Sequence, residues 1–244
     1  MRDAFADDPA SGTGSGGKNG AKAALYDAFA AGGKALASGK RLELLDLLAQ
    51  GERTVDALAK TAGLNLTTAS AHLQTLKQAG FVATRRDGVR IHYRLAGDDV
   101  ARLLGLLRQV AERHQATVPA ARDAYLGAAD TDELSREELL ARMAAGDVVV
   151  LDVRPPEEYR AGHVPGALCV PVAELARRIG ELPEEAEVVV YCRGAYCALA
   201  HDAVRLLTAH GRRAVRLHDG MPEWRLSGLP VETGGTGVSG PLGA

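Results

Sequence analysis

A run of β-branched residues that ends in a cysteine and passes straight into a helical pattern constrains this chain more than any other segment. Residues 188–191 read Val-Val-Val-Tyr, Cys192 follows at once, and an Ala/Leu-rich helical pattern begins at residue 197. This order predicts a buried strand that turns into a helix. The first N–H groups of a helix lack internal partners and its N-terminal end is positive, so an anionic sulfur is stabilised there. We therefore expect Cys192 to be a nucleophilic thiol with a lowered pKa.

Charge is distributed unevenly over a chain whose length suits two domains. With 244 residues, 46% of them hydrophobic and 25% charged, the chain is long enough to bury two cores. Residues 67–94 are locally basic, whereas residues 130–232 contain 18 acidic and 12 basic side chains. We therefore expect only the first half to attract nucleic acid.

The ends of the chain and its cysteine content indicate a cytoplasmic protein. Residues 1–20 and 234–244 are Gly-rich without apolar periodicity, which predicts a disordered N-terminal tail and a flexible C-terminal tail. Three cysteines are too few for a disulfide-framed secreted fold, and the N-terminus lacks the apolar core of a signal peptide. No run approaches the roughly 18 apolar residues of a membrane span. We expect reduced thiols and no membrane partner.

Turn and cap signals between residues 34 and 95 follow a specific order. A helical pattern at 34–50 precedes a short helix capped by Thr54 and ended by Gly63, and a third helix opens at Asn65 or Thr67 and runs to Gln78. Two strand patterns at 81–86 and 89–95 then flank the pair Asp-Gly, the strongest two-residue hairpin signal. This order predicts a mainly α domain at 21–127, a helix-turn-helix followed by a β-hairpin wing.

A long helical pattern at 98–126 carries more apolar surface than one small domain needs. Leu103, Leu104, Leu106 and Leu107 are crowded onto it. We expect this helix to bury its apolar face against a second copy of the chain, as a homodimer.

The segment 41–95 resembles the ArsR family of winged-helix repressors. The resemblance is carried by Arg-Leu-Glu-Leu-Leu at 41–45, Ser-Ala-His-Leu at 70–73 and Gly-Phe-Val at 80–82. It implies a homodimer that binds double-stranded operator DNA.

The stretch that holds a metal-sensing cysteine pair in many members reads Glu-Arg-Thr-Val-Asp-Ala-Leu at 52–58, so a thiolate metal site is unsupported. Asp99 and His114 do not form a convincing ligand set, and we expect no metal.

Two elements of this domain supply candidate DNA contacts. Small or polar side chains of the third helix can face the major groove, and wing arginines can reach phosphates; the alternative is an ordinary solvated helix in a small bundle. The candidates are Thr67, Thr68, Ser70, His72, Thr75, Arg85, Arg86 and Arg90.

Helices and apolar strands alternate after a boundary near residues 127–130, which indicates an α/β domain with a mostly parallel sheet. Ser135 and Glu138 fit a capping box, and residues 148–151 form a buried strand pattern. Residues 131–233 resemble a rhodanese (sulfurtransferase) domain over their whole length. The motifs are Leu-Asp-Val-Arg-Pro-Pro-Glu-Glu-Tyr at 151–159, Gly-His-Val-Pro-Gly-Ala at 162–167, the Cys192 loop, and Asp-Gly-Met-Pro-Glu-Trp at 219–224.

The rhodanese resemblance implies a catalytic role for Cys192, which attacks a sulfur donor and carries a persulfide. Loop N–H groups would surround the sulfur as an anion nest. The resemblance also implies supporting roles for Asp152 and Arg154, for which an ion pair joining strand ends is an equal alternative, and turn packing for His163. The nest residues are Arg193, Gly194, Ala195, Tyr196 and Cys197.

Other residues near the loop narrow the chemistry. Phosphatases and arsenate reductases of this fold carry an arginine six positions after the cysteine, where this chain has Ala198, so a small, sulfur-sized pocket is favoured. Arg193 favours an anionic donor such as thiosulfate. Cys197 is either a resolving thiol, through a disulfide or polysulfide with Cys192, or a small packing residue. Cys169 is expected to be an inert strand residue.

Two functions are compatible with both motifs. The first is a homodimeric DNA-binding regulator in which an oxidised sulfur species on Cys192, formed from thiosulfate or polysulfide, is coupled to operator binding. The alternative is a sulfurtransferase whose winged helix serves for dimerisation or autoregulation. Neither function requires a bound cofactor.

Overall fold

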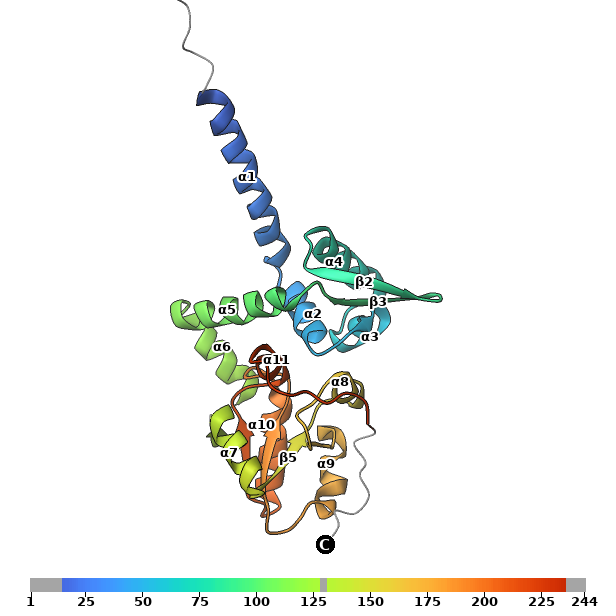
Figure 1. The fold of residues 1–244 in the computed structure, drawn as a ribbon, viewed down its shortest axis with the longest axis vertical. Helices are drawn as coiled ribbons and strands as arrows, with labels where there is room; N and C mark the ends of the chain where they lie inside the picture. The colour runs from blue at the N-terminus through green and yellow to red at the C-terminus, as the bar shows by residue number, and fades with distance from the viewer. Residues whose placement is uncertain (1–14, 128–130, 236–244) are drawn as a thin grey trace, which may run out of the picture.

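The chain forms two domains, each with its own sheet, in a computed structural model that describes residues 15–127 and 131–235 (Figure 1). The prediction of a winged-helix domain followed by an α/β domain is confirmed. The N-terminal elements are α1 (Ser15–Leu36), α2 (Gly39–Ala49), β1 (Arg53–Thr54), α3 (Val55–Thr61), α4 (Leu66–Gln78), β2 (Val82–Asp87), β3 (Arg90–Leu95), α5 (Asp98–His114) and α6 (Thr117–Leu126).

Side-chain caps begin both helices of the helix-turn-helix. Thr54 Oγ1 accepts a hydrogen bond from the N–H of Ala57 at 3.3 Å and begins α3. Asn65 Oδ1 accepts one from the N–H of Thr68 at 2.8 Å, so Asn65 rather than Thr67 begins α4. Each cap satisfies an N–H that has no partner within the helix.

The wing is a β-hairpin whose turn lies one residue later than the sequence pattern suggested. Asp87 pairs with Arg90, which leaves Gly88 and Val89 as the turn. Gly88 has a φ of +58°, the sign that the first position of a type II′ turn requires. Strand β1 pairs with β3 through Arg53 and Tyr93, which completes a three-stranded sheet in the order β1-β3-β2.

Three predictions for this part of the chain need correction. The expected helix over 98–126 is divided into α5 and α6 at residues 115–116, because proline lacks the N–H that a continuous helix would need at Pro119. The expected tail over 1–20 contains the start of α1 at Ser15, in a segment rich in Ala and Lys that favours helix. The rest of that tail, residues 1–14, and residues 236–244 lie outside the described residues. The helix expected over 34–50 is likewise divided, between α1 and α2, at residues 37–38.

The C-terminal domain contains a five-stranded parallel sheet in the order β4-β8-β7-β5-β6, as the alternating pattern predicted. Its elements are β4 (Glu133–Leu134), α7 (Arg136–Ala145), β5 (Val148–Asp152), α8 (Pro156–Ala161), β6 (Leu168–Cys169), α9 (Val172–Arg178), a 3₁₀ turn (Ile179–Glu181), β7 (Glu187–Tyr191), α10 (Ala198–Ala209), β8 (Ala214–Leu217) and α11 (Met221–Leu226).

The central strand β7 supplies both cores of this domain. Val188 and Val190 belong to the cluster that includes Leu207 of α10, whereas Val189 and Tyr191 belong to the cluster that includes Trp224 of α11. This alternation follows from the two-residue period of a strand. Cys192, the next residue, is buried in the α10 cluster.

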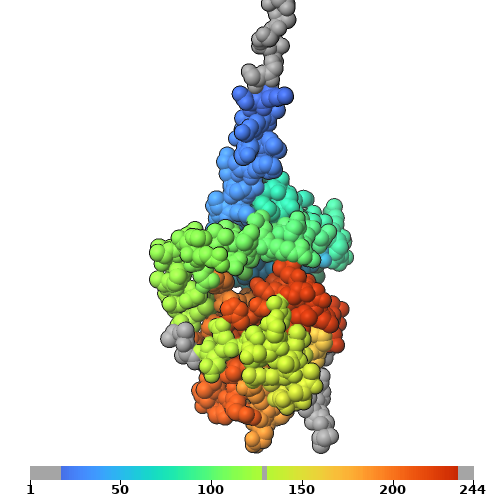
Figure 2. Space-filling model, turned by 60° about the vertical axis from the view of Figure 1, so that its left-hand side comes forward, coloured from blue at the N-terminus to red at the C-terminus, as the bar shows by residue number. Residues whose placement is uncertain are grey.

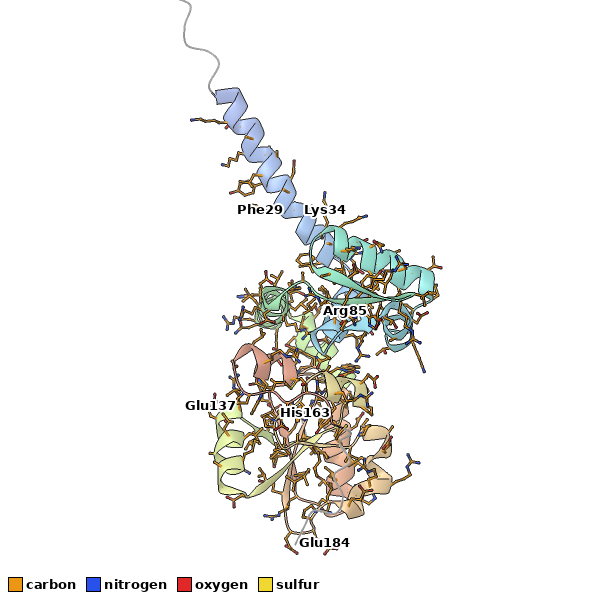
Figure 3. The ribbon with its side chains drawn as sticks, turned by 45° about the vertical axis from the view of Figure 1, so that its right-hand side comes forward. Phe29, Lys34, Arg85, Glu137, His163 and Glu184 are labelled. Carbon is orange, nitrogen blue, oxygen red and sulfur yellow. The ribbon has the colours of Figure 1, made fainter. Side chains whose placement is uncertain are left out.

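The domains contact each other along one side of the winged helix. Figure 2 shows the light-green α5 and α6 resting against the orange and red elements of the C-terminal domain. α1 extends away from both domains in Figure 1, and Figure 3 shows Phe29 projecting from it; this side chain is 67% exposed. The cysteine loop, which follows the carboxyl end of β7, lies at the boundary between the two domains, where Gln50 of the winged-helix domain contacts Arg193.

Candidate active site and nucleic-acid interface

The loop 192–197 joins the end of β7 to the start of α10. The N–H of Cys197 donates to the carbonyl of Gly194 at 3.0 Å, and the thiol of Cys192 lies 3.6 Å from the Cys197 carbonyl. Gly194 has a φ of +139°, which favours glycine and allows the loop to curl back. Backbone N–H groups of Gly194 and Ala200 favour a charge on the Cys192 sulfur. One of these N–H groups belongs to the loop and the other to the first turn of α10.

The turn 219–222 braces the loop from the other side. A Cβ on Gly220 would lie 2.1 Å from the nitrogen of Gly194, so only glycine allows the two backbones to meet. The N–H of Met221 donates to the carbonyl of Cys192 at 3.2 Å, and Glu223 accepts from the N–H of Gly220 at 3.0 Å. The Asp-Gly-Met-Pro-Glu-Trp motif therefore holds the cysteine loop in place.

The two thiols of the loop have pKa values that are shifted in opposite directions. Burial raises the pKa of Cys192 well above its ordinary value, and Cys197 raises it further. The hydrogen bond from Cys192 lowers the pKa of Cys197 to about 7, with help from the backbone N–H groups of Arg193 and Leu199, although burial opposes it. The expected lowering at Cys192 is therefore wrong for the reduced loop, because its sulfur is enclosed while Cys197 caps α10.

Asp152 and Arg154 form a fully buried pair, as the ion-pair alternative anticipated. Arg154 Nη2 lies 2.6 Å from Asp152 Oδ2, which also accepts a 2.7 Å hydrogen bond from the hydroxyl of Tyr191. Arg154 further donates to the carbonyl of Gly162 at 2.8 Å. The pair ties β5 to the end of β7 next to Cys192.

His163 packs within the turn of the chain that contains it. Its ring stacks on Tyr159 with 3.6 Å between ring centroids, and its backbone forms a bridge with Glu232. Figure 3 shows it in the upper part of the C-terminal domain.

Glu158 connects the cysteine loop to the winged helix. This carboxylate is 1% exposed and lies 2.5 Å from both Arg193 Nη2 of the loop and Arg53 Nη2 of β1. Gln50, also fully buried, donates to the carbonyl of Arg193 at 3.4 Å and accepts from Arg154 at 3.2 Å. Sequence reasoning missed Glu158, Gln50 and Arg53, because their partners lie a hundred or more residues away.

The backbone between α2 and β1 fits closely against the second domain. A Cβ on Gly51 would lie 2.7 Å from the Cβ of Ala161. The carbonyl of Ala49 accepts a hydrogen bond from Arg225 at 3.1 Å. The segment 49–53 of the winged-helix domain therefore packs closely against the C-terminal domain near its cysteine loop.

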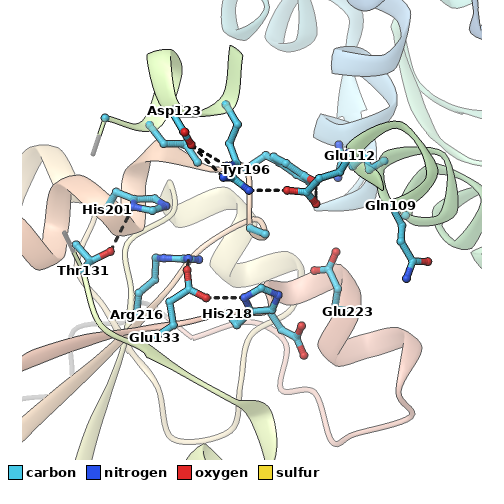
Figure 4. Close-up of a pocket in the computed structure, with 17 residues that line it drawn as sticks. Gln109, Glu112, Asp123, Thr131, Glu133, Tyr196, His201, Arg216, His218 and Glu223 are labelled. Carbon is cyan, nitrogen blue, oxygen red and sulfur yellow. Dashed lines mark hydrogen bonds and ion pairs between the residues drawn. The ribbon is translucent and has the colours of Figure 1, made fainter. Parts of the chain in front are cut away.

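A second contact joins the loop to α5. The hydroxyl of Tyr196 donates to Glu112 at 2.7 Å, and the guanidinium of Arg108 lies 5.8 Å from the centre of the Tyr196 ring. This contact borders a cavity of about 560 Å³ between the domains. Glu112 also pairs with Arg122 at 2.6 Å. Figure 4 shows Glu112 on one side of the cavity and Glu133 paired with His218 on the other. Ala195 and Tyr196 form the part of the wall that belongs to the loop.

The candidate DNA residues lie on α4 and the wing, but their exposure differs from expectation. Thr67 is exposed, whereas Thr68, Ser70, His72 and Thr75 are half-buried. The outer face of α4 also includes Ala71, Gln74 and Lys77, which the pattern had not assigned to the groove.

The wing arginines are exposed. Arg85 pairs with Glu52 at 3.1 Å, Arg86 donates to the carbonyl of Gly88 at 3.2 Å, and Arg90 lies at the tip beside the turn. Figure 3 labels Arg85 on the winged-helix domain.

Other sequence candidates do not form a site together. Asp99 and His114 lie at opposite ends of α5. Within residues 15–127 and 131–235, no group of three or more His, Cys, Asp or Glu side chains is arranged to hold a metal.

Burial raises the pKa of Cys169, in β6, to about 11. In the described part of the chain, no helix combines the length and apolarity that crossing a membrane requires.

Comparison with known proteins matches both halves of the chain. The model of the bacterial regulatory protein arsR family matches residues 38–84, and that of the rhodanese-like domain matches residues 135–227. The HTH-type transcriptional regulator Rv0324 of Mycobacterium tuberculosis is 56% identical over 218 residues, which are 89% of this chain and 96% of that protein.

Two further matches each cover one half. A sulfurtransferase of Allochromatium vinosum is 34% identical over 41% of this chain and 94% of its own length. The solution structure of a homodimeric winged helix-turn-helix DNA-binding domain from Mycobacterium bovis is 59% identical over 39% of this chain and 89% of its own, with a TM-score of 0.37.

Proposed function

The chain belongs to the ArsR-type helix-turn-helix transcriptional regulators that carry a rhodanese-like domain, and from this premise we propose that it couples sulfur bound at Cys192 to operator binding. A sulfane donor such as thiosulfate or polysulfide converts Cys192 to a persulfide. The observation that carries the proposal is the buried carboxylate of Glu158, which bonds to the sulfur loop and the winged helix at once.

Operator binding by a dimer is the output of this proposal. The outer face of α4 enters the major groove, and Arg86 and Arg90 of the wing contact phosphates. Apolar side chains on α5 support pairing with a second copy, since they are exposed along one helix. They are Leu103, Leu106, Leu107 and Val110, with exposed fractions of 38–56%.

A short series of contacts supports coupling between the two functions. Arg193 lies beside Cys192, and Glu158 joins it to Arg53. Arg53 pairs in register with Tyr93 of the wing, whose hydroxyl accepts a 3.3 Å hydrogen bond from Gln74 on α4. A shift of the cysteine loop therefore changes the contacts that support α4 and the wing.

A persulfide changes the loop in a defined way. It adds an outer sulfur atom, which carries a negative charge, to a cysteine that is 3% exposed. The added volume has to be accommodated in a close-packed region. Arg193 is also drawn to the new anion and away from Glu158, which leaves Arg53 as the carboxylate's remaining partner.

Operator affinity measured on the full chain tests this proposal. Fluorescence anisotropy with labelled operator is recorded for reduced protein and for protein treated with thiosulfate or polysulfide, with the mass change at Cys192 followed on the same sample. Allosteric couplings of this kind change affinity by about 5- to 150-fold, and we expect a change in that range. Cys192→Ser should abolish the change and Cys169→Ala should retain it. An unchanged affinity in wild-type protein whose mass shows that Cys192 has reacted would show that the domains act separately.

The anion nest favours a second candidate function, catalytic sulfur transfer. The N–H groups of Gly194 and Ala200 stabilise charge on the nucleophilic sulfur, as a transferase needs in each cycle. Thiosulfate:cyanide turnover by purified protein tests it, with Cys192→Ser as the inactive control. Turnover without any effect on operator affinity would favour the enzyme.

A further inference from the structure

The second cysteine of the loop is placed to act on the first. Cys192 ends β7 and Cys197 begins α10, and the 3.0 Å hydrogen bond from the Cys197 N–H to the Gly194 carbonyl folds the loop so that the two residues meet. The sulfur of Cys192 lies 3.6 Å from the backbone carbonyl oxygen of Cys197, so the two residues are in contact. Both side chains are buried in the same apolar cluster.

The surroundings of Cys197 suit a base and a nucleophile. The thiol of Cys192, the backbone N–H groups of Arg193 and Leu199 and the Arg193 guanidinium all lower the pKa of Cys197. Together they outweigh burial, which raises it, and bring the pKa of Cys197 to about 7. A packing residue would need none of these polar neighbours.

Cys169 provides a contrast within the same domain. It is also buried, but it lies on β6, separated from β7 by β5, and burial raises its pKa to about 11. A thiol that only packs in this fold therefore stays protonated.

We propose that Cys197 is a second catalytic residue, which first accepts the proton of Cys192 and then resolves the persulfide to a Cys192–Cys197 disulfide with release of sulfide. This inference rests on the proposed persulfide at Cys192.

The steps balance without an additional oxidant. The Cys192 thiolate attacks the outer sulfur of thiosulfate, the sulfur–sulfur bond of the donor breaks, and sulfite leaves. Cys197 then attacks Sγ of Cys192, the bond from Sγ to the outer sulfur breaks, and the outer sulfur leaves as HS⁻ with the Cys197 proton. Two thiols are oxidised to a disulfide while one sulfane sulfur is reduced to sulfide. An external thiol resets the loop.

Sulfide release and mass spectrometry on the full chain test the inference. Wild-type protein, Cys197→Ala, Cys197→Ser and the control Cys169→Ala are treated with thiosulfate or polysulfide after reduction. Wild type and Cys169→Ala should release sulfide and lose two hydrogen masses. The Cys197 variants should instead retain one added sulfur on Cys192 and release no sulfide.

Peptide mapping of the wild-type sample decides the case even if both Cys197 variants fail to fold. Trypsin cleaves after Arg193, so a Cys192–Cys197 disulfide joins two peptides, residues 179–193 and 194–205. A stable persulfide on wild-type Cys192 without this cross-link would overturn the resolving role and leave the proposed function intact. Absence of sulfur uptake, sulfide release and cross-link in wild type would overturn both.

Discussion

Arg53 of the winged helix and Glu158 of the rhodanese-like domain form a buried ion pair, with Arg53 Nη2 2.5 Å from Glu158 Oε1 and side chains that are 6% and 1% exposed. Arg193 of the sulfur loop binds the same carboxylate. The two arginines carry one more charge than the carboxylate neutralises, so a new anion at the loop competes with Glu158 for Arg193.

Removing the Glu158 charge should destabilise the protein. Removing one partner of a buried ion pair lowers the free energy of unfolding by about 3–5 kcal/mol, because it leaves an uncompensated buried charge. We expect Glu158→Gln to fall in this range. Urea unfolding measures the change. The matched control is Glu157→Gln, whose carboxylate is 56% exposed and 3.9 Å from Arg53; it should cost less than about 1 kcal/mol. Equal effects of the two variants would contradict the role of Glu158.

A methyl group at Gly220 should disable the sulfur loop. Its Cβ would lie 2.1 Å from the Gly194 nitrogen, so the loop has to shift. Misplacing a catalytic group by about 1 Å costs roughly 100-fold in rate, and we expect a loss of that order in persulfide formation by Gly220→Ala. Gly180→Ala is the control, since nothing lies within 4 Å of its Cβ position. Rapid-quench mass measurement gives the rates, and an unaltered rate in Gly220→Ala would show that the loop tolerates the shift.

Alkylation of the loop should depend on pH through Cys197. A lowered pKa means that the thiolate, the reactive form, persists at pH values below the ordinary thiol range, and it is lost as the pH falls through about 7. In Cys192→Ala, the hydrogen bond that lowers this pKa most is removed, so the midpoint should move upward. Peptide mapping after pulses of iodoacetamide at several pH values measures both midpoints. A midpoint that is the same in both proteins would argue against the shared proton.

Wing arginines should contribute to operator affinity through phosphate contacts. Replacing Arg90 with Ala should weaken binding and reduce the salt slope by about 1, because one counterion fewer is released. Arg177→Ala, an exposed arginine on α9 of the other domain, is the control and should leave the slope unchanged. Affinities measured across a salt series separate these outcomes, and an unchanged slope for Arg90→Ala would remove the wing tip from the interface.

A charge on the apolar face of α5 should prevent the dimerisation that we propose for this face. Leu106 is 56% exposed in the single chain, and burying a carboxylate there without a partner is unfavourable, so Leu106→Asp should sediment as a monomer. Leu140→Asp, on α7 and 37% exposed, should sediment like wild type. Analytical ultracentrifugation of the three proteins is the measurement, and a dimeric Leu106→Asp variant would place the dimer interface elsewhere.

The sequence by itself determined the order of the elements and the position of the sulfur. Caps at Thr54, Asn65 and Ser135 are formed by residues within three positions of each other, so local chemistry sufficed to predict them. The alternation along β7 and the motif after it likewise predicted where Cys192 lies. The helix breaks at residues 37–38 and 115–116 were missed because the apolar pattern continues on both sides of them.

Only the tertiary structure decided how the two thiols of the loop are shifted and where the two domains contact each other. Burial raises the pKa of Cys192, the neighbouring Cys192 lowers that of Cys197, and neither effect follows from local sequence. Glu158 meets Arg53 across 105 positions of the chain, and Gln50 meets Arg193 across 143. Such contacts depend on how two separately folded cores dock, which is why a sulfur site and a DNA-binding domain could each be predicted while the connection between them could not.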